Sequence, residues 1–81
     1  MKVKVFGMDK CAGCETVKAL LSARGVDFVV RDVMNVDHME EAQKAGVRSV
    51  PTTLVTIGET EHVFVGSAKA TLDSILLHVG A

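Results

Sequence analysis

The order in which two kinds of apolar periodicity follow one another is the strongest constraint on the fold of this chain. Residues 2–6 alternate polar and apolar side chains, and the segments 27–33, 52–57 and 62–65 are short and rich in β-branched residues, as strands are. The segment 27–33 is apolar enough to be a parallel strand buried within a sheet. Segments with helical spacing follow the first, second and last of these strands, which gives the order β-α-β-α-β-β-α. We therefore predict a single α/β domain over residues 1–81, with a mixed four-stranded sheet flanked by helices.

Capping residues and glycines predict where the helices begin and end. The first helix is expected over Cys11–Arg24, because a glycine follows that can adopt the left-handed conformation of a helix end. The second is expected to begin at a capping box, Asp37–Glu40, and to stop at Gly46. The last is expected to be capped by Ser67 or Thr71. Its core-facing side chains are expected to be Leu72, Ile75, Leu76 and Val79.

Composition excludes several classes of function. The chain has 81 residues, of which 48% are hydrophobic, and a formal net charge of -1. Its Lys and Arg residues are scattered, so no basic patch for nucleic acid is indicated. The first residues alternate like a strand instead of forming the apolar run of a signal peptide, and no later run reaches membrane-spanning length. We expect a cytoplasmic monomer that binds neither nucleic acid nor membranes.

The two cysteines, Cys11 and Cys14, form a CxxC pair whose chemistry is open at first. Two thiolates suit Cu(I), and GMDKCAGC is close to the GMxCxxC loop of small copper-carrying domains. However, Asp9 and Lys10 separate Met8 from the first cysteine, where those domains have one residue, and those domains end on a strand. A zinc site needs four ligands, and the histidines show no paired spacing. A soft-metal (Cu or Zn) module remains the alternative, as do two inert buried cysteines.

A redox pair explains more of the same residues. Positions i and i+3 of a helix lie about 5–6 Å apart on one face, within the range that a disulfide tolerates. Cys11 is expected at the helix N-terminus, where the helix dipole and Lys10 lower the pKa of its thiol from about 8.5 to about 7. Cys14 is expected one turn inside, facing the core, where it can resolve a mixed disulfide. Asp9 and Lys10 would tune the site.

The chain's single proline, Pro51, lies at the start of a strand within the sequence SVPT. The CxxC pair, this V-P-T stretch and the element order together resemble the thioredoxin-fold redoxins, the glutaredoxin branch in particular. The resemblance implies a cis Val50–Pro51 bond beside Cys11. It also implies that the Val50 backbone pairs with the substrate, and that Gly66 and Ser67 form the far wall of the groove. The residues that it assigns to substrate binding are Lys10, Val50, Pro51, Thr52, Gly66 and Ser67.

The resemblance further implies a dithiol thiol–disulfide oxidoreductase that carries electrons to disulfide-containing proteins, ribonucleotide reductase among them. It implies no bound cofactor or metal, and either glutathione or thioredoxin reductase as the electron donor. Glutathione-using glutaredoxins usually carry CPYC, whereas this chain has CAGC. They also have Gly-Gly and an acidic pair that holds the glutathione amino group, where this chain has Gly66-Ser67-Ala68-Lys69. The redoxins that serve ribonucleotide reductase draw electrons from thioredoxin reductase, and this chain matches their size.

Overall fold

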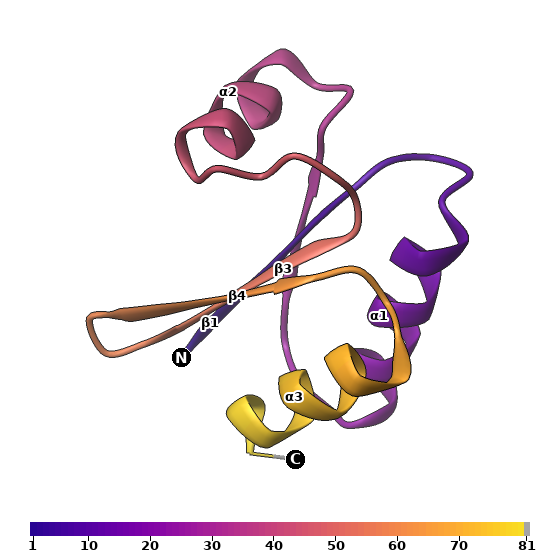
Figure 1. The fold of residues 1–81 in the computed structure, drawn as a ribbon, viewed down its shortest axis with the longest axis vertical. Coiled ribbons are helices and arrows are strands. Elements are labelled where there is room, and N and C mark those ends of the chain that lie inside the picture. Colours follow the sequence, from indigo (N-terminus) through magenta and orange to yellow (C-terminus); the bar gives the residue numbers. More distant parts are fainter. Residues whose placement is uncertain (81) are drawn as a thin grey trace.

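Four strands form one mixed sheet in the computed structural model, which describes residues 1–80. The strands are β1 (Lys2–Gly7), β2 (Val29–Asp32), β3 (Thr52–Ile57) and β4 (Thr60–Val65). Their order in the sheet is β2-β1-β3-β4, with β1 parallel to β2 and antiparallel to β3 (Figure 1). The crossover from β1 to β2 and the β3–β4 hairpin confirm the predicted architecture.

Three helices cover the two faces of this sheet. Helices α1 (Ala12–Ala23) and α3 (Lys69–Val79) lie on one face, and α2 (Val36–Lys44) covers part of the other (Figure 1). The alternation of side chains along β1 supplies both layers, because Val3 and Val5 point towards α1 and α3 while Phe6 points towards α2. The larger core contains Val3, Val5, Val17, Leu21, Val55, Ile75 and Val79. The smaller core contains Phe6, Val33, Ala42 and Leu54.

The first helix ends as the sequence predicts, and its start places the cysteines. Gly25 has a φ of 68°, and the Val26 N–H donates to the Leu21 carbonyl at 3.0 Å, which closes the last turn. Cys11 lies just before the helix as its N-cap and Arg24 just after it as its C-cap. The helix therefore carries Cys14, Val17 and Leu21 on its buried face.

The second helix stops before Gly46, which has a φ of 77°, as predicted. The predicted N-caps of the other two helices are wrong. Helix α2 is capped by Asn35, whose Oδ1 accepts from the Asp37 and His38 N–H groups at 2.9 and 3.3 Å, so Asp37 lies inside the first turn. Helix α3 has Ala68 as its N-cap and no side-chain cap. Thr71 lies within α3 and donates its hydroxyl to the Val65 carbonyl at 3.3 Å, so it is engaged elsewhere. The cap of α2 thus precedes the predicted Asp37, and the cap of α3 lies between the two predicted candidates, Ser67 and Thr71.

The second strand also differs from its prediction. It is parallel to β1, but it lies at an edge of the sheet and spans Val29–Asp32 instead of 27–33. Val29 and Val30 are exposed, while the residues that pack into the cores are its neighbours Phe28 and Val33. The apolar run does not predict the exposure of this strand. Because β3 pairs with the other side of β1, β2 is an edge strand with a single neighbouring strand.

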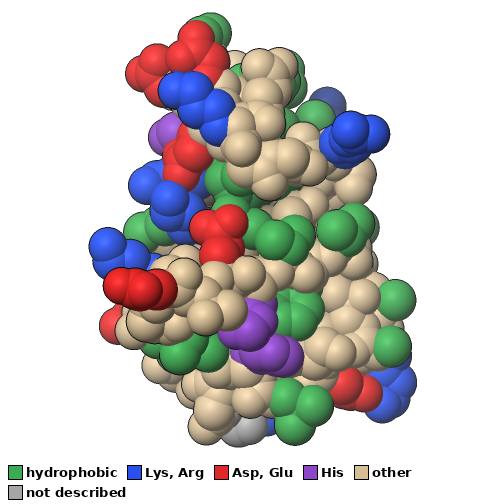
Figure 2. Space-filling view, turned by 60° about the vertical axis from the view of Figure 1, so that its left-hand side comes forward, with side chains coloured by type: hydrophobic (Ala, Val, Ile, Leu, Met, Phe, Trp, Pro, Cys, Tyr) green, Lys and Arg blue, Asp and Glu red, His purple; other side chains and the backbone are tan. Residues whose placement is uncertain are grey.

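None of the helices within residues 1–80 has the length and apolar character needed to cross a membrane. On the face shown in Figure 2, acidic and basic side chains are interspersed.

One cluster of charges ties α2 to the sheet. Glu41 of α2 accepts from Lys4 of β1 and, at 2.9 Å, from the Nε of Arg31 on β2. The hydrogen bond from Lys4, with the positive charges of Lys4 and Arg31, holds the pKa of the Glu41 carboxyl below its usual range, against the opposing effect of burial. A carboxyl with a lowered folded-state pKa contributes stability above its unfolded pKa and loses that contribution as the pH falls through the folded pKa.

Replacing Glu41 by glutamine is therefore expected to lower the free energy of unfolding by about 0.5–1 kcal/mol at pH 7, since these groups are about one-third exposed and solvent screens them. The difference from the parent protein should be smaller at about pH 3 than at pH 7, because the contribution of the carboxylate is lost as the pH falls through its lowered folded-state pKa. Urea unfolding at the two pH values measures this. Glu40→Gln, an exposed neighbour on α2, is the matched control. A difference that is the same at both pH values would contradict this electrostatic explanation.

Candidate active site

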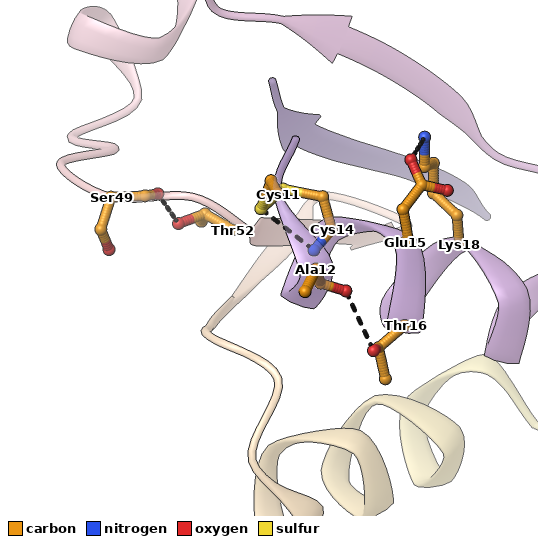
Figure 3. The surroundings of a disulfide bond; sticks show 8 residues. All are labelled: Cys11, Ala12, Cys14, Glu15, Thr16, Lys18, Ser49 and Thr52. Atoms are coloured by element: carbon orange, nitrogen blue, oxygen red, sulfur yellow. Dashed lines mark hydrogen bonds and ion pairs between the residues drawn. A yellow bond between two sulfur atoms is a disulfide. The ribbon is translucent and has the colours of Figure 1, made fainter. Parts of the chain in front are cut away.

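The two cysteines are joined by a disulfide at the start of α1 (Figure 3). Their sulfur atoms are 2.18 Å apart and their Cα atoms 5.2 Å apart, which one helical turn supplies without any rearrangement. The loop after β1 delivers Cys11 as the helix N-cap, where it is partly exposed. Cys14 belongs to the first turn and is 1% exposed. One sulfur is therefore open to an incoming molecule, and the other is enclosed.

The helix N-terminus supplies the electrostatics of the exposed sulfur. The Cys14 N–H donates to the Cys11 Sγ at 3.1 Å, so a backbone donor of the first turn points at this atom. The positive end of the helix dipole acts in the same direction. Lys10 directly precedes Cys11, is exposed and has a left-handed φ of 58°. These features favour a negative charge on Cys11 after reduction.

Pro51 and Ser67 pack against the short segment between the two cysteines. The Val50–Pro51 bond is cis, which confirms what the resemblance implies. A Cβ on Gly13 would lie 3.1 Å from Pro51 Cδ and 2.7 Å from Ser67 Oγ, so the missing side chain at this position permits the approach. The Gly66 N–H donates to the Pro51 carbonyl at 2.8 Å, and this hydrogen bond holds the residue after β4 against the residue before β3. The structure thus brings Pro51, Gly66 and Ser67 together at the dithiol loop.

The other two residues predicted near the groove, Val50 and Thr52, differ in their surroundings. Thr52 is buried, and its hydroxyl donates to the Ser49 carbonyl at 2.7 Å, so this side chain fixes the loop before β3 (Figure 3). Val50 is half-buried and lines a groove of about 190 Å³, whose other walls include Met8, Met39 and Arg48. This groove lies between α2, the loop after β1 and the loop before Pro51.

Two residues near the enclosed sulfur were missed in the sequence. A Cβ on Gly7 would lie 3.1 Å from Cys14 Sγ, so the bare backbone at the end of β1 leaves room for this sulfur. Lys18 lines a cavity together with Cys14. The spacing of Cys14 and Lys18, four positions apart on one helix face, was a signal that could have found the lysine. Within residues 1–80 no three His, Cys, Asp or Glu side chains gather as a metal site would require.

A comparison with protein-family profiles identifies the family to which this chain belongs. The sequence profile described as Glutaredoxin matches residues 3–60, more than half of the chain, and the match contains both the CxxC pair and Pro51. The chain belongs to the glutaredoxin family. Membership of this family and the CxxC disulfide support a redox role of the thiol–disulfide oxidoreductase class for this glutaredoxin-family protein. A comparison with curated proteins gave no significant match.

Solved structures confirm the thioredoxin fold of this glutaredoxin-family protein. Thioredoxin 1 from Thermosipho africanus superposes with a TM-score of 0.70 at 22% identity, over 99% of this chain and 96% of its own. The glutaredoxin-like NrdH-redoxin from Escherichia coli gives a TM-score of 0.69 at 22% identity, over 93% of this chain and 95% of its own. A thioredoxin from Nicotiana alata is 30% identical, with a TM-score of 0.69, over 95% of this chain and 70% of its own.

Proposed function

We propose that this protein is a dithiol electron carrier that reduces disulfides in protein substrates. The observation that carries the proposal is the unequal exposure of two disulfide-bonded cysteines at one helix N-terminus. In the reduced protein, the Cys11 thiolate attacks a substrate disulfide, a mixed disulfide forms, and one substrate thiolate leaves. The Cys14 thiolate then attacks Cys11 Sγ, and the second substrate thiolate leaves. Two electrons pass to the substrate, and the protein ends with its Cys11–Cys14 disulfide.

The proposed substrate lies along the groove beside Val50. In this proposal an extended segment of the substrate pairs with the Val50 backbone, which places its disulfide over Cys11. In this proposal Pro51 and the buried Thr52, whose hydroxyl fixes the loop before β3, hold Val50 in place, while Gly66 and Ser67 lie on the other side of the dithiol loop, next to Gly13. Lys10 lies at the exposed end beside Cys11. The partly exposed Cys11 and the mainly apolar side chains that line the groove of about 190 Å³ support a substrate segment that carries apolar side chains next to its disulfide.

We further propose thioredoxin reductase as the electron donor in preference to glutathione. The segment Gly66–Lys69 contains no carboxylate, whereas glutathione-using glutaredoxins are expected to hold the glutathione amino group there with an acidic pair. The carboxylate of Asp73, which follows this segment, forms an ion pair with Lys69 Nζ at 2.9 Å and is therefore already engaged. The Escherichia coli NrdH-redoxin is described as a glutaredoxin-like protein with a thioredoxin-like activity profile. Ribonucleotide reductase is one candidate among the protein substrates.

The experiment that tests the donor offers the oxidised protein either NADPH with thioredoxin reductase or glutathione with glutathione reductase. We expect rapid NADPH oxidation with the first system and a rate at least about tenfold lower with the second. Reduction of insulin by the protein in the presence of dithiothreitol, followed by turbidity, measures dithiol activity independently of the donor. Activity in the insulin assay with preference for glutathione would overturn the donor assignment alone. Inactivity with insulin and with both donors would overturn the proposed function.

A further inference from the structure

A cavity of about 60 Å³ lies behind the enclosed sulfur, between α1 and the ends of β1 and β2. Its apolar walls include Val5 and Val30, and Cys14 reaches it from α1. A void of this size is large enough for several water molecules, and its charged rim gives them polar partners. The charged residues that line it are Asp9, Glu15, Lys18 and Asp32. The cavity therefore connects the one cysteine that is hidden from solvent with ionisable side chains.

The proposed reaction needs a charge on this hidden sulfur. Cys14 must become a thiolate before it can attack the mixed disulfide on Cys11. An apolar environment opposes that ionisation, and Cys14 is 1% exposed. The helix N-terminus helps Cys11 directly, since the backbone donor of the first turn points at Cys11 Sγ. A separate source of positive charge near Cys14 would compensate for its burial.

Lys18 is the cation that the structure places there. It lies four residues after Cys14 on the same face of α1, and a helical side chain leans back over the preceding turn. Its ammonium is held by Glu15 at 2.8 Å, just along α1 from Cys14 (Figure 3). The side chain of Lys18 is 30% exposed and that of Glu15 is 71% exposed, so Lys18 is the more buried partner of the pair.

We propose that Lys18 is a positioning residue for the resolving step: its ammonium stabilises the Cys14 thiolate across the cavity, and Glu15 orients and moderates that charge. This inference rests on the proposed dithiol function. The three carboxylates that also line the cavity, Asp9 from the loop after β1, Glu15 from α1 and Asp32 from β2, act in the opposite direction. Asp32 already accepts the Met34 N–H at 2.9 Å and Asp9 is exposed, which weakens their effect on Cys14, whereas Glu15 is paired with Lys18 and offsets part of its charge. The proton that Cys14 loses leaves through the cavity to solvent.

The size of the effect follows from Coulomb's law and from thiol reactivity. For any two unit charges about 7–10 Å apart at an effective dielectric of about 20, Coulomb's law gives a shift of about one to two pH units in an ionisation midpoint. The partial exposure of Lys18 and the nearby Glu15 carboxylate reduce the shift expected here to about one. Removing the ammonium therefore lowers the thiolate fraction about tenfold at low pH. It also makes the remaining thiolate about threefold more nucleophilic, because reactivity rises with basicity at a slope near 0.4–0.5. The net result is a resolving step about threefold slower at low pH and about threefold faster at high pH.

The experiment follows the resolving step with 5,5′-dithiobis(2-nitrobenzoate) in a stopped-flow instrument. Attack by Cys11 releases one 2-nitro-5-thiobenzoate, and attack by Cys14 on the mixed disulfide releases a second. The reagent concentration is raised until the second phase no longer depends on it, and that rate is recorded across pH. For Lys18→Met, which keeps an unbranched side chain and removes the charge, we expect a profile that crosses that of the parent protein, with its midpoint about one pH unit higher.

Three further variants separate charge from packing. Lys18→Arg is expected to restore the parent profile, and Glu15→Gln is expected to move the midpoint to lower pH. Lys44→Met, the same charge change on α2 across the sheet, is the matched control and should leave the profile in place. A parent protein that releases one equivalent of thiol overturns the dithiol function itself. A parent protein that releases two, with a Lys18→Met rate that is unchanged or uniformly slower at every pH, overturns the inference about Lys18 alone.

Discussion

Replacing Cys11 by serine is expected to reduce the rate of insulin disulfide reduction to the background of the assay, a loss of at least about a thousandfold. A serine hydroxyl is not ionised at neutral pH and cannot exchange with sulfur, so the first covalent bond to the substrate never forms. The remaining cysteine cannot substitute for Cys11, because Cys14 is enclosed by Gly7, the cavity and the first turn of α1. The loss should be in turnover, with the fold unchanged by circular dichroism.

Cys14→Ser is the matched variant, and we expect it to stop the reaction after the first step, whereas Cys11→Ser prevents the first step. Cys11 is still exposed at the helix N-terminus, so it still attacks a disulfide, but no second thiol releases the product. We therefore expect the variant to accumulate a stable mixed disulfide with a model substrate, such as a peptide disulfide. Intact-protein mass spectrometry detects the adduct, which a reducing agent should remove. An adduct that forms on Cys11→Ser and not on Cys14→Ser would reverse the two roles and contradict the structural assignment.

The features that the sequence predicts correctly are those fixed by periodicity or by unusual chemistry. The order of strands and helices follows from the alternation along β1 and from the helical stripe of Cys14, Val17 and Leu21. The cysteines and the single proline are conspicuous by residue type, and the resemblance that they support correctly implies the cis bond before Pro51. The catalytic roles of the two cysteines are predictions that the variants above test, and the substrate-binding role of Pro51 stays a prediction.

The features that the sequence does not predict depend on contacts between distant segments. Nothing in the local sequence distinguishes Gly13 from other small residues. Its lack of a side chain matters only because folding packs Pro51 and Ser67 against it. The exposure of β2 depends on which side of β1 the hairpin occupies, and the apolar run itself contains no such information. The choice of Ala68 as the N-cap of α3 depends on the path of the chain after β4, where the Thr71 hydroxyl donates a hydrogen bond to the Val65 carbonyl. Local capping patterns fail at such positions because tertiary packing outweighs them.

Phe6 is the residue on which the smaller core depends most. It is the largest of the fully buried side chains among residues 1–80. Val33, Ala42 and Leu54 share its core, and these residues connect β1, β3 and α2. Helix α2 is short, so Phe6 supplies much of the apolar contact that holds this helix to the sheet. Phe6 also directly precedes Gly7, which packs against Cys14 Sγ.

Phe6→Ala is expected to lower the free energy of unfolding by about 3–5 kcal/mol, through the lost burial and the cavity left beneath α2. A domain of this size has roughly 4–12 kcal/mol in total, so the variant should be close to unfolded at 37 °C. Phe6→Leu, which keeps most of the volume, should cost about 1–1.5 kcal/mol. Leu77→Ala, where the residue is 81% exposed on α3, should change the value by less than about 0.5 kcal/mol. Urea unfolding of the oxidised proteins measures all three. Equal effects of Phe6→Ala and Leu77→Ala would contradict the packing of α2 on the sheet, because they would mean that the phenylalanine side chain is exposed to water in solution.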